Sequence, residues 1–309
     1  MTEPPPLPEG FAVGHWSDLA GGTGCTVVIP PPETPGGVCV HGGGPGTRET
    51  DTLGPLANAS EANAILITGG SAFGLAAADG VVRWLEEHER GYFTPFGRVP
   101  LVPAAVIYDL PSGEGNVRPG PEAGYAACEA AAGGVPERGR VGAGTGATVG
   151  KVLGRERAVR GGLGYAAMIT GTGHTVAAIA TVNAMGDVID ADGSLLAGPR
   201  SDGAAVRSSG LIAEMKEAPE YRIPEGNSTP VCVCTDAVLD KRQCSIVARS
   251  ATAGMGRAID PVFTPVDGDV VFCLASGRGE PEQFAPIQIG AAAATVTAAA
   301  IRDAVRQAG

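Results

Sequence analysis

The chain has 309 residues, 44% hydrophobic and 18% charged, with a formal net charge of −11. No block of Lys or Arg offsets the acid, which argues against binding to nucleic acid or to an anionic membrane surface, because both need a clustered basic face. No apolar run reaches the roughly 18 residues of a membrane span, and the Pro-rich, acidic start lacks a signal-peptide pattern, so we expect a cytoplasmic protein.

In the first half of the chain, glycine and proline residues separate the predicted strands and helices. We predict a loose arm over residues 1–14, strands over 24–30 and 37–43 that pair with each other, a strand over 63–70, a helix over 71–89, a core strand over 101–110 and an Ala-rich helix over 121–134. In the 71–89 helix the apolar side chains repeat with a 3.6-residue period and are expected to face the core. These are Phe73, Ala77, Val81, Trp84 and Leu85.

The second half opens with a glycine-rich loop over 139–154, whose spacing around Lys151 does not fit a nucleotide-binding P-loop. We then predict a strand with a turn over 175–190, a polar loop to about 202, a partial helix over 202–215, a turn-rich segment over 217–230, a strand over 231–235, a helix over 239–259, a strand over 269–277 and a helix over 285–307. Strands and helices mix without strict alternation, which predicts an α+β fold with helices covering sheets, in a single domain over 1–309.

The seven cysteines are an odd number, and most have apolar neighbours. We expect buried thiols of a reduced compartment. Cys232 and Cys234 are two apart in a predicted strand and should share a face. A metal site there would need further soft ligands, and the four histidines are scattered, so no metal or cofactor is expected.

The sequence "EGNST", residues 225–229, leads from a turn into the predicted strand 231–235. A hydroxyl residue at this place is usually a turn residue. A Ser or Thr at a newly made amino terminus, however, carries its own base, an α-amine with a pKa of about 8. Cleavage before Ser228 would make such a residue, and the strand would hold it rigidly. The segment is therefore a candidate site of self-cleavage.

Six blocks, in order along the chain, make the sequence similar to the DmpA-type aminopeptidase family. They are "ITGGSAFGLAAADGVVRWLEE", "VPAAVIYDL", "GAGTGATVGK", "VNAMGDV", "GNSTPVCVCTDAVLDK" and "IDPVFTPVDGDVVFCLASG". That family includes L-aminopeptidase/D-amidase/esterases, β-peptidyl aminopeptidases and the nylon-oligomer endo-hydrolase. The resemblance implies a four-layer αββα sandwich, as in N-terminal-nucleophile hydrolases, and autocleavage into chains 1–227 and 228–309.

The resemblance also implies roles for individual residues. The cut falls between Asn227 and Ser228, with Ser228 the nucleophile. Asp267 and Asp269 match an acidic pair that would orient the new ammonium, and on an extended segment the two carboxylates would share a face. Asn183 would donate to an oxyanion. The resemblance further implies Lys151 and Tyr108 as catalytic residues and backbone N–H groups of Gly69, Gly70 and Ser71 as substrate-binding groups.

The family pattern leaves the substrate open. The nylon-oligomer enzyme has Thr where this chain has Ser228, and the β-aminopeptidases carry Ser and Glu where this chain has Asp267 and Asp269. Small peptides, amino-acid amides or esters and 6-aminohexanoate oligomers are all candidate substrates, and the resemblance implies a homotetramer of αβ units. The alternatives are an acyl transferase like ornithine acetyltransferase, which shares the architecture, and a non-catalytic, uncleaved scaffold.

Overall fold

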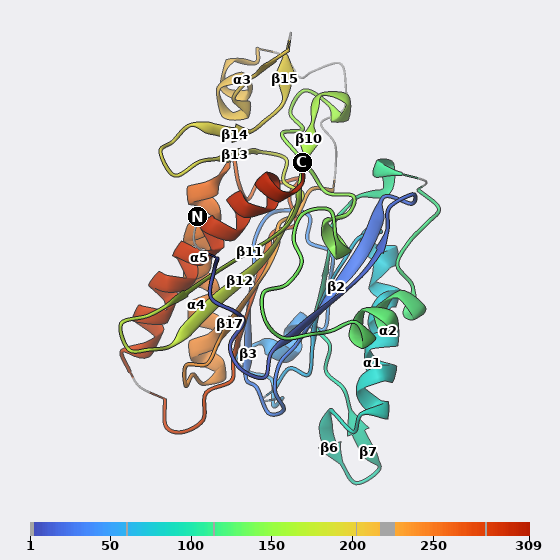
Figure 1. Ribbon diagram of the computed structural model, residues 1–309, viewed down its shortest axis with the longest axis vertical. Coiled ribbons are helices and arrows are strands. Elements are labelled where there is room, and N and C mark those ends of the chain that lie inside the picture. The colour runs from blue at the N-terminus through green and yellow to red at the C-terminus, as the bar shows by residue number, and fades with distance from the viewer. Residues whose placement is uncertain (1–2, 60, 114, 202, 217–225, 282) are drawn as a thin grey trace.

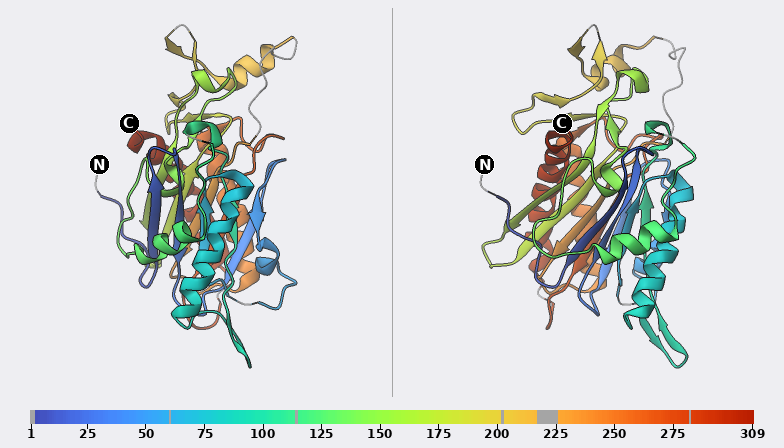
Figure 2. Two further views of the ribbon diagram at one scale, coloured as in Figure 1. Left: turned by 90° about the vertical axis from the view of Figure 1, so that its right-hand side faces the viewer. Right: turned by 45° about the vertical axis from the view of Figure 1, so that its right-hand side comes forward.

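The computed structural model describes residues 3–59, 61–113, 115–201, 203–216, 226–281 and 283–309. Two five-stranded sheets lie face to face, and a pair of helices covers the outer face of each (Figure 1). The other views show the same four layers, with α1 and α2 on one outer side and α4 and α5 on the other (Figure 2). The expected αββα sandwich is confirmed.

The first sheet has the strand order β1-β2-β5-β8-β4. Its strands are β1 (Ala12–Asp18), β2 (Thr23–Ile29), β5 (Ile65–Thr68), β8 (Ala104–Val106) and β4 (Thr47–Arg48). Its pairs are antiparallel except β5 with β8. Helices α1 (Ala77–Glu87) and α2 (Pro121–Glu129) pack on its outer face.

The second sheet has the order β11-β12-β17-β19-β3. Its strands are β11 (Gly162–Ile169), β12 (Thr175–Val182), β17 (Pro230–Thr235), β19 (Val270–Ala275) and β3 (Gly36–Val40). Only β17 and β19 are parallel. Helices α4 (Lys241–Ala258) and α5 (Ala285–Gln307) cover its outer face, and a capping box at Asp240 begins α4.

Side chains along the central strands point alternately to the two faces of the sheet. They therefore contribute to two different hydrophobic cores. In β17, Val231 and Val233 face α4 and α5, whereas Cys232 and Cys234 face the first sheet. The Sγ atoms of the two cysteines lie 4.0 Å apart, so their predicted common face is confirmed. Six of the seven cysteines are buried, and Cys39 is half-buried. A strand buried on both sides favours a run of apolar residues, and β17 is apolar from Pro230 to Cys234.

Smaller elements lie at the two ends of the sandwich (Figure 1). They are the pairs β6 (Tyr92–Thr94) with β7 (Gly97–Val99), β9 (Thr148–Val149) with β10 (Val159–Arg160), and β15 (Arg200–Ser201) with β16 (Ala204–Ala205), the three strands β13 (Asp187–Ile189), β14 (Leu195–Ala197) and β18 (Ile259–Asp260), and the short helix α3 (Ser208–Glu214). β13 and α3 lie at one end, and the β6–β7 hairpin lies at the other.

Several sequence predictions were wrong in detail. Strands 24–30 and 37–43 do not pair, because the proline-rich link after β2 carries the chain to the other sheet, where β3 pairs with β19. The arm predicted over 1–14 runs into β1, and β11 was not predicted. Of the core strand predicted over 101–110, only residues 104–106 form a strand. Of the segment 217–230, residues 217–225 lie outside the described residues.

The helix predicted over 71–89 begins as a 3-10 helix, η2 (Ser71–Ala76), before α1. Ala77, Val81 and Leu85 are buried as expected. Phe73, predicted to face the core, is 57% exposed, because the tighter turn rotates it outward, where the Arg118 guanidinium lies 3.7 Å from its ring centre.

Among the described residues, none of the helices combines the length and the apolar character that crossing a membrane requires.

Close packing of α4 on α5 depends on a missing side chain. A Cβ atom on Gly254 would lie 2.1 Å from the carbonyl oxygen of Ala294, whereas a Cβ on the exposed Gly256 would meet nothing within 4 Å. We therefore expect Gly254→Ala to lower the unfolding free energy by about 1–3 kcal/mol. The matched Gly256→Ala should raise it by about 0.5–1 kcal/mol, because alanine favours the helix. Denaturant unfolding of both variants measures this, and equal stabilities would contradict the packing described.

Candidate active site

Two main-chain contacts hold the peptide bond between Asn227 and Ser228, just before β17. On one side Ser228 N donates to Asn183 O at 3.0 Å, and Asn183 N donates to Ser228 O at 3.1 Å. On the other side Asn227 N donates to Val266 O at 3.1 Å. Ser228 is 3% exposed and Asn227 is fully buried. The bond is therefore fixed inside the protein rather than displayed on a loose loop.

The carbonyl oxygen of Asn227 accepts two hydrogen bonds. Ser228 Oγ donates to it at 2.6 Å, and Gly268 N donates to it at 2.6 Å. A main-chain N–H in this position can stabilise negative charge on that oxygen. A Cβ at Gly268 would lie 2.9 Å from Ser228 Oγ and 2.4 Å from Gly44 O, so only glycine fits. Sequence reasoning missed Gly268, although it stands between the two predicted acids.

Gly226 forms the turn just before the peptide bond between Asn227 and Ser228, which is called the junction below. Its φ is +83°, a conformation that glycine adopts without strain, and a Cβ there would lie 2.5 Å from Cγ of the Tyr108 ring. Tyr108 thus packs directly against the residue before Asn227. Its main-chain oxygen accepts from Asn183 Nδ2 at 3.3 Å. The Asn183 amide, expected to donate to an oxyanion, is donating to this carbonyl instead.

Lys151 is fully buried beside the junction. Its Nζ donates to Asn183 O at 2.8 Å and to Asn183 Oδ1 at 2.9 Å. Asn183 O is also the acceptor of Ser228 N, so the lysine amine and the serine nitrogen share one oxygen. Burial, and next the charge of Arg155, lower the pKa of Lys151 well below its ordinary value. A neutral amine at this point can accept a proton.

Asp269 is buried beside Thr229, the residue that follows Ser228. Its Oδ1 accepts from Thr229 N at 2.7 Å, and its Oδ2 accepts from Phe263 N at 3.2 Å. Burial, and next the charge of Asp267, raise the pKa of Asp269 to about 8. The carboxyl therefore fixes the residue after Ser228 rather than Ser228 itself.

Asp267 is buried on the other side of Gly268. Its Oδ1 accepts from Met185 N at 3.2 Å, and its Oδ2 accepts from Thr264 N and from the Thr264 hydroxyl. Burial raises the pKa of Asp267, while the Thr264 hydroxyl and then the charge of Lys151 oppose that rise. The structure thus brings both predicted acids to the junction, and protein N–H groups occupy their oxygens.

Gly69 and Gly70 link β5 to η2, Ser71 begins η2, and the N–H groups of all three bond within the chain. The acceptors are Gly24 O for Gly69, Asp109 Oδ1 for Gly70 and Ile107 O for Ser71. Asp109 directly follows Tyr108, which packs against Gly226. The bond from Gly70 N to Asp109 therefore connects this turn to the junction. Sequence reasoning missed Asp109, although the "VIYD" block contains it.

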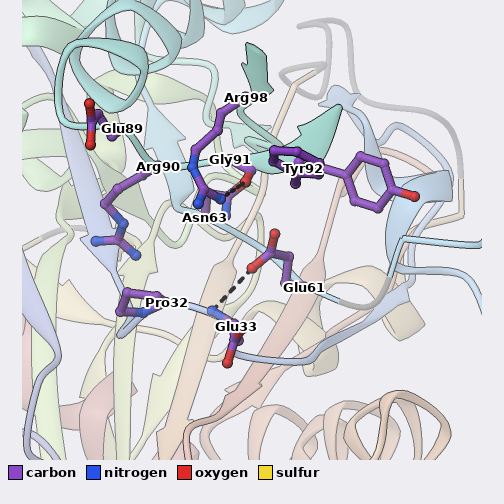
Figure 3. A pocket seen from close by; sticks show the side chains of 10 residues that line it. Pro32, Glu33, Glu61, Asn63, Glu89, Arg90, Gly91, Tyr92 and Arg98 are labelled. Atoms are coloured by element: carbon purple, nitrogen blue, oxygen red, sulfur yellow. Dashed lines mark hydrogen bonds between the residues drawn. The ribbon is translucent and has the colours of Figure 1, made fainter. Parts of the chain in front are cut away.

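A cavity of about 590 Å³ lies well away from this junction, at the base of the β6–β7 hairpin. Figure 3 shows Glu61 between Arg98 and Glu33, with Arg90 to their left. Glu33 N donates to Glu61 Oε2 at 3.0 Å, and Arg98 donates to Gly91 O. β13, which follows Asn183 closely, lies at the opposite end of the sandwich (Figure 1). Within the described residues, no group of three His, Cys, Asp or Glu side chains is placed to bind a metal.

The sequence of this chain is similar to known hydrolases over nearly its whole length. A family model described as peptidase family S58 matches residues 9–309. An uncharacterized aminopeptidase of Mycobacterium tuberculosis is 41% identical over 326 residues, covering 94% of this chain and 90% of the relative. The 6-aminohexanoate-oligomer endohydrolase of Paenarthrobacter ureafaciens is 30% identical over 272 residues, covering 86% of this chain and 73% of that enzyme.

Solved structures share the fold. A β-aminopeptidase of a Burkholderia species superposes with a TM-score of 0.70 at 21% identity, covering 96% of this chain and 84% of the other. The L-aminopeptidase D-Ala-esterase/amidase of Ochrobactrum anthropi, described as a variant of the Ntn hydrolase fold, gives a TM-score of 0.69 at 18% identity with the same coverage.

The raised pKa of Asp269 predicts a pH dependence of stability. The unfolded chain loses this proton near the ordinary value of 3.8, whereas the folded protein keeps it up to about 8. The stabilising contribution of Asp269 is therefore complete below about pH 4 and declines as the pH rises toward 8. We compare two uncut proteins, Ser228→Ala and Ser228→Ala with Asp269→Asn. The unfolding free energy of the first minus that of the second should fall across this pH window and level off above it.

Denaturant unfolding at several pH values measures this difference. Asp190→Asn is the matched control, because the half-buried Asp190 has a lowered pKa and its contribution should stay constant across the same window. A constant difference for Asp269→Asn would contradict a protonated, buried Asp269.

Proposed function

Since this chain belongs to peptidase family S58 and is a hydrolase of amide bonds, we propose that it cuts itself between Asn227 and Ser228 and then uses Ser228 as an amino-terminal nucleophile. One observation carries the proposal. The hydroxyl of Ser228 lies 2.6 Å from the carbonyl oxygen of the bond to be cut, and Gly268 N–H donates to the same oxygen. Nucleophile and oxyanion donor already meet at one carbonyl.

Self-cleavage proceeds by an acyl shift. Ser228 Oγ attacks the carbonyl carbon of Asn227, its proton passes to the amine of Lys151, and Gly268 N–H stabilises the oxyanion. The C–N bond then breaks, and the leaving nitrogen of Ser228 takes the proton from Lys151. Water hydrolyses the resulting ester, which frees the carboxylate of Asn227 and restores the hydroxyl. The shared acceptor, Asn183 O, supports this route, because it holds both nitrogens at one place.

Hydrolysis of substrates follows the same chemistry. The new α-amine of Ser228 has a pKa near neutrality and takes the hydroxyl proton during attack on the substrate carbonyl. Asn183 O orients that amine, and Asp269 fixes Thr229 behind it. The amine then protonates the leaving group, and water releases the acyl half. Asp267 holds the chain on either side of the site through its bonds to Met185 N and Thr264 N.

The substrates are small peptides, amino-acid amides or esters, or 6-aminohexanoate oligomers. The aminopeptidase and endohydrolase names of the relatives support amide hydrolysis over the alternatives, acyl transfer to ornithine and a non-catalytic scaffold. No cofactor enters the proposed steps.

The cut chains stay together in this proposal. The chain 228–309 supplies β17 and β19 to the middle of one sheet and both helices of one outer layer, so each chain needs the other to bury its core. We further propose a homotetramer of such pairs. Exposed Ile246 and Ile287 beside a cavity of about 440 Å³ on the outer face of α4 and α5 support association there.

Ser228→Ala should abolish both cleavage and hydrolysis, because it removes the only attacking atom in the mechanism. On a denaturing gel the variant should give one full-length band, whereas wild type gives chains of 227 and 82 residues. Ser228→Thr keeps the hydroxyl and should retain cleavage at a reduced rate. Ser245→Ala is the matched control and should behave as wild type, since Ser245 Oγ donates to Lys241 O within α4. Cleavage in Ser228→Ala would refute the mechanism.

Lys151→Met should slow self-cleavage by about tenfold or more, because it keeps the side chain's bulk but removes the amine that carries the proton. Newly synthesised protein sampled over time on a denaturing gel gives the rate. Lys241→Met is the matched control, because Lys241 Nζ also donates to main-chain oxygens, those of Thr52, Ala57 and Ala59, away from the junction. Equal cleavage rates in the two variants would remove Lys151 from the mechanism.

A further inference from the structure

A second cavity, of about 220 Å³, is lined by three arginines. Arg140 precedes η4 (Gly142–Gly144), Arg155 begins η5 (Arg155–Arg157), and Arg160 ends β10. Between residues 138 and 160 the chain carries five arginines and one lysine against a single acid, Glu156, although the whole chain has a net charge of −11. Positive charge is thus concentrated at this one cavity.

The three arginines have main-chain oxygens as their partners. Arg140 Nε donates weakly to Thr145 O at 3.5 Å, Arg155 Nη2 donates to Tyr108 O at 3.3 Å, and Arg160 Nη1 donates to an oxygen of Gly309 at 3.2 Å. None of the ion pairs found between side chains of the described residues includes them. Each guanidinium has five N–H donors, so most of these remain available to a ligand.

A hydroxyl group adds to this donor set. Thr148 lines the cavity, and its Oγ1 is buried without a hydrogen-bond partner among the described residues. A buried hydroxyl without a partner is costly, which favours a ligand that accepts from it. Asp109, two residues before the lining residue Pro111, does not fill this role, because Gly70 N and Thr23 Oγ1 already donate to its two oxygens.

The cavity is connected to the reacting atoms through single residues. Arg155 Nη2 and Asn183 Nδ2 donate to the same oxygen, that of Tyr108. Thr148 N donates to Asn183 Oδ1 at 3.1 Å, and Asn183 in turn holds Ser228 N. Hydrogen bonds through Tyr108 and Asn183 therefore link two lining residues, Arg155 and Thr148, to the nucleophile.

We propose that Arg140, Arg155 and Arg160, with Thr148, form a carboxylate-binding subsite that selects substrates carrying an acidic group on the leaving half. Guanidinium groups suit this ligand, because their forked N–H groups pair with both oxygens of a carboxylate. The acidic group is the terminal carboxylate of a short peptide or an acidic side chain. The inference rests on the proposed function of Ser228 and names the class of substrate that it takes.

The test compares substrates that differ only in charge. They are L-alanyl-L-alanine, its uncharged C-terminal amide, and L-alanyl-L-glutamic acid α-amide, whose only carboxylate is in the side chain. We expect wild type to hydrolyse at least one acid with a kcat/KM about tenfold or more above that of the uncharged amide. The preferred acid identifies the source of the carboxylate. Arg140→Gln and Arg155→Gln should each reduce several-fold the acid-to-amide ratio, which is kcat/KM for the preferred acid divided by kcat/KM for the uncharged amide.

Arg157→Gln is the matched control, because Arg157 belongs to the same segment, is exposed and does not line the cavity. It should keep the wild-type ratio. The ratio cancels general losses of activity, so a merely structural effect of a variant would not move it. Equal rates for acids and amide in wild type, or an unchanged ratio in both arginine variants, would overturn the subsite while leaving amide hydrolysis intact.

Calorimetric binding separates this proposal from the proposed function. If wild type hydrolyses none of the three compounds or L-alanyl p-nitroanilide, the function assigned to Ser228 fails. Tighter binding of an acid than of the uncharged amide, lost in Arg140→Gln, would still support the anion site. Equal binding of acids and amide would overturn it.

Discussion

The geometry of this protein depends on how one peptide bond is held. Main-chain hydrogen bonds from Asn183 on one side and from Val266 and Gly268 on the other fix the bond between Asn227 and Ser228. Both contacts are extensions of the second sheet, because Asn183 follows β12 and Gly268 precedes β19, the two neighbours of β17. The sheet therefore aligns a hydroxyl with a carbonyl without needing any side chain to do so, and this alignment is what self-cleavage requires.

Buried charge is the cost of this arrangement. Lys151, Asp267 and Asp269 are almost completely shielded from water, and burial shifts each pKa toward the neutral form. Main-chain N–H groups and carbonyls form hydrogen bonds with these side chains, and burial raises the pKa of Asp269 to about 8. Groups with such affinities can exchange protons during catalysis, whereas ordinary ion pairs of the same residues would hold their charges fixed.

The sequence predicted the parts of the fold that local pattern controls. The helix over 285–307 was predicted at its exact limits, and the helix predicted over 239–259 corresponds to α4. The pairing of β3 with β19 was not predictable, because it joins segments more than 200 residues apart. Family resemblance located Ser228, Lys151 and Asn183 in the sequence. The contribution of Gly268 depends on a main-chain N–H, which no residue type reveals, and the arginine cavity depends on tertiary contacts between separate loops.

The central claim is that Ser228 becomes an amino terminus. Amino-terminal sequencing and mass determination of the small chain of purified wild-type protein test it most directly. The account predicts a fragment that begins with Ser-Thr-Pro-Val at Ser228 and ends at Gly309, together with a partner chain that ends at Asn227. A single intact chain of 30.8 kDa, or a cut at any other bond, would contradict it.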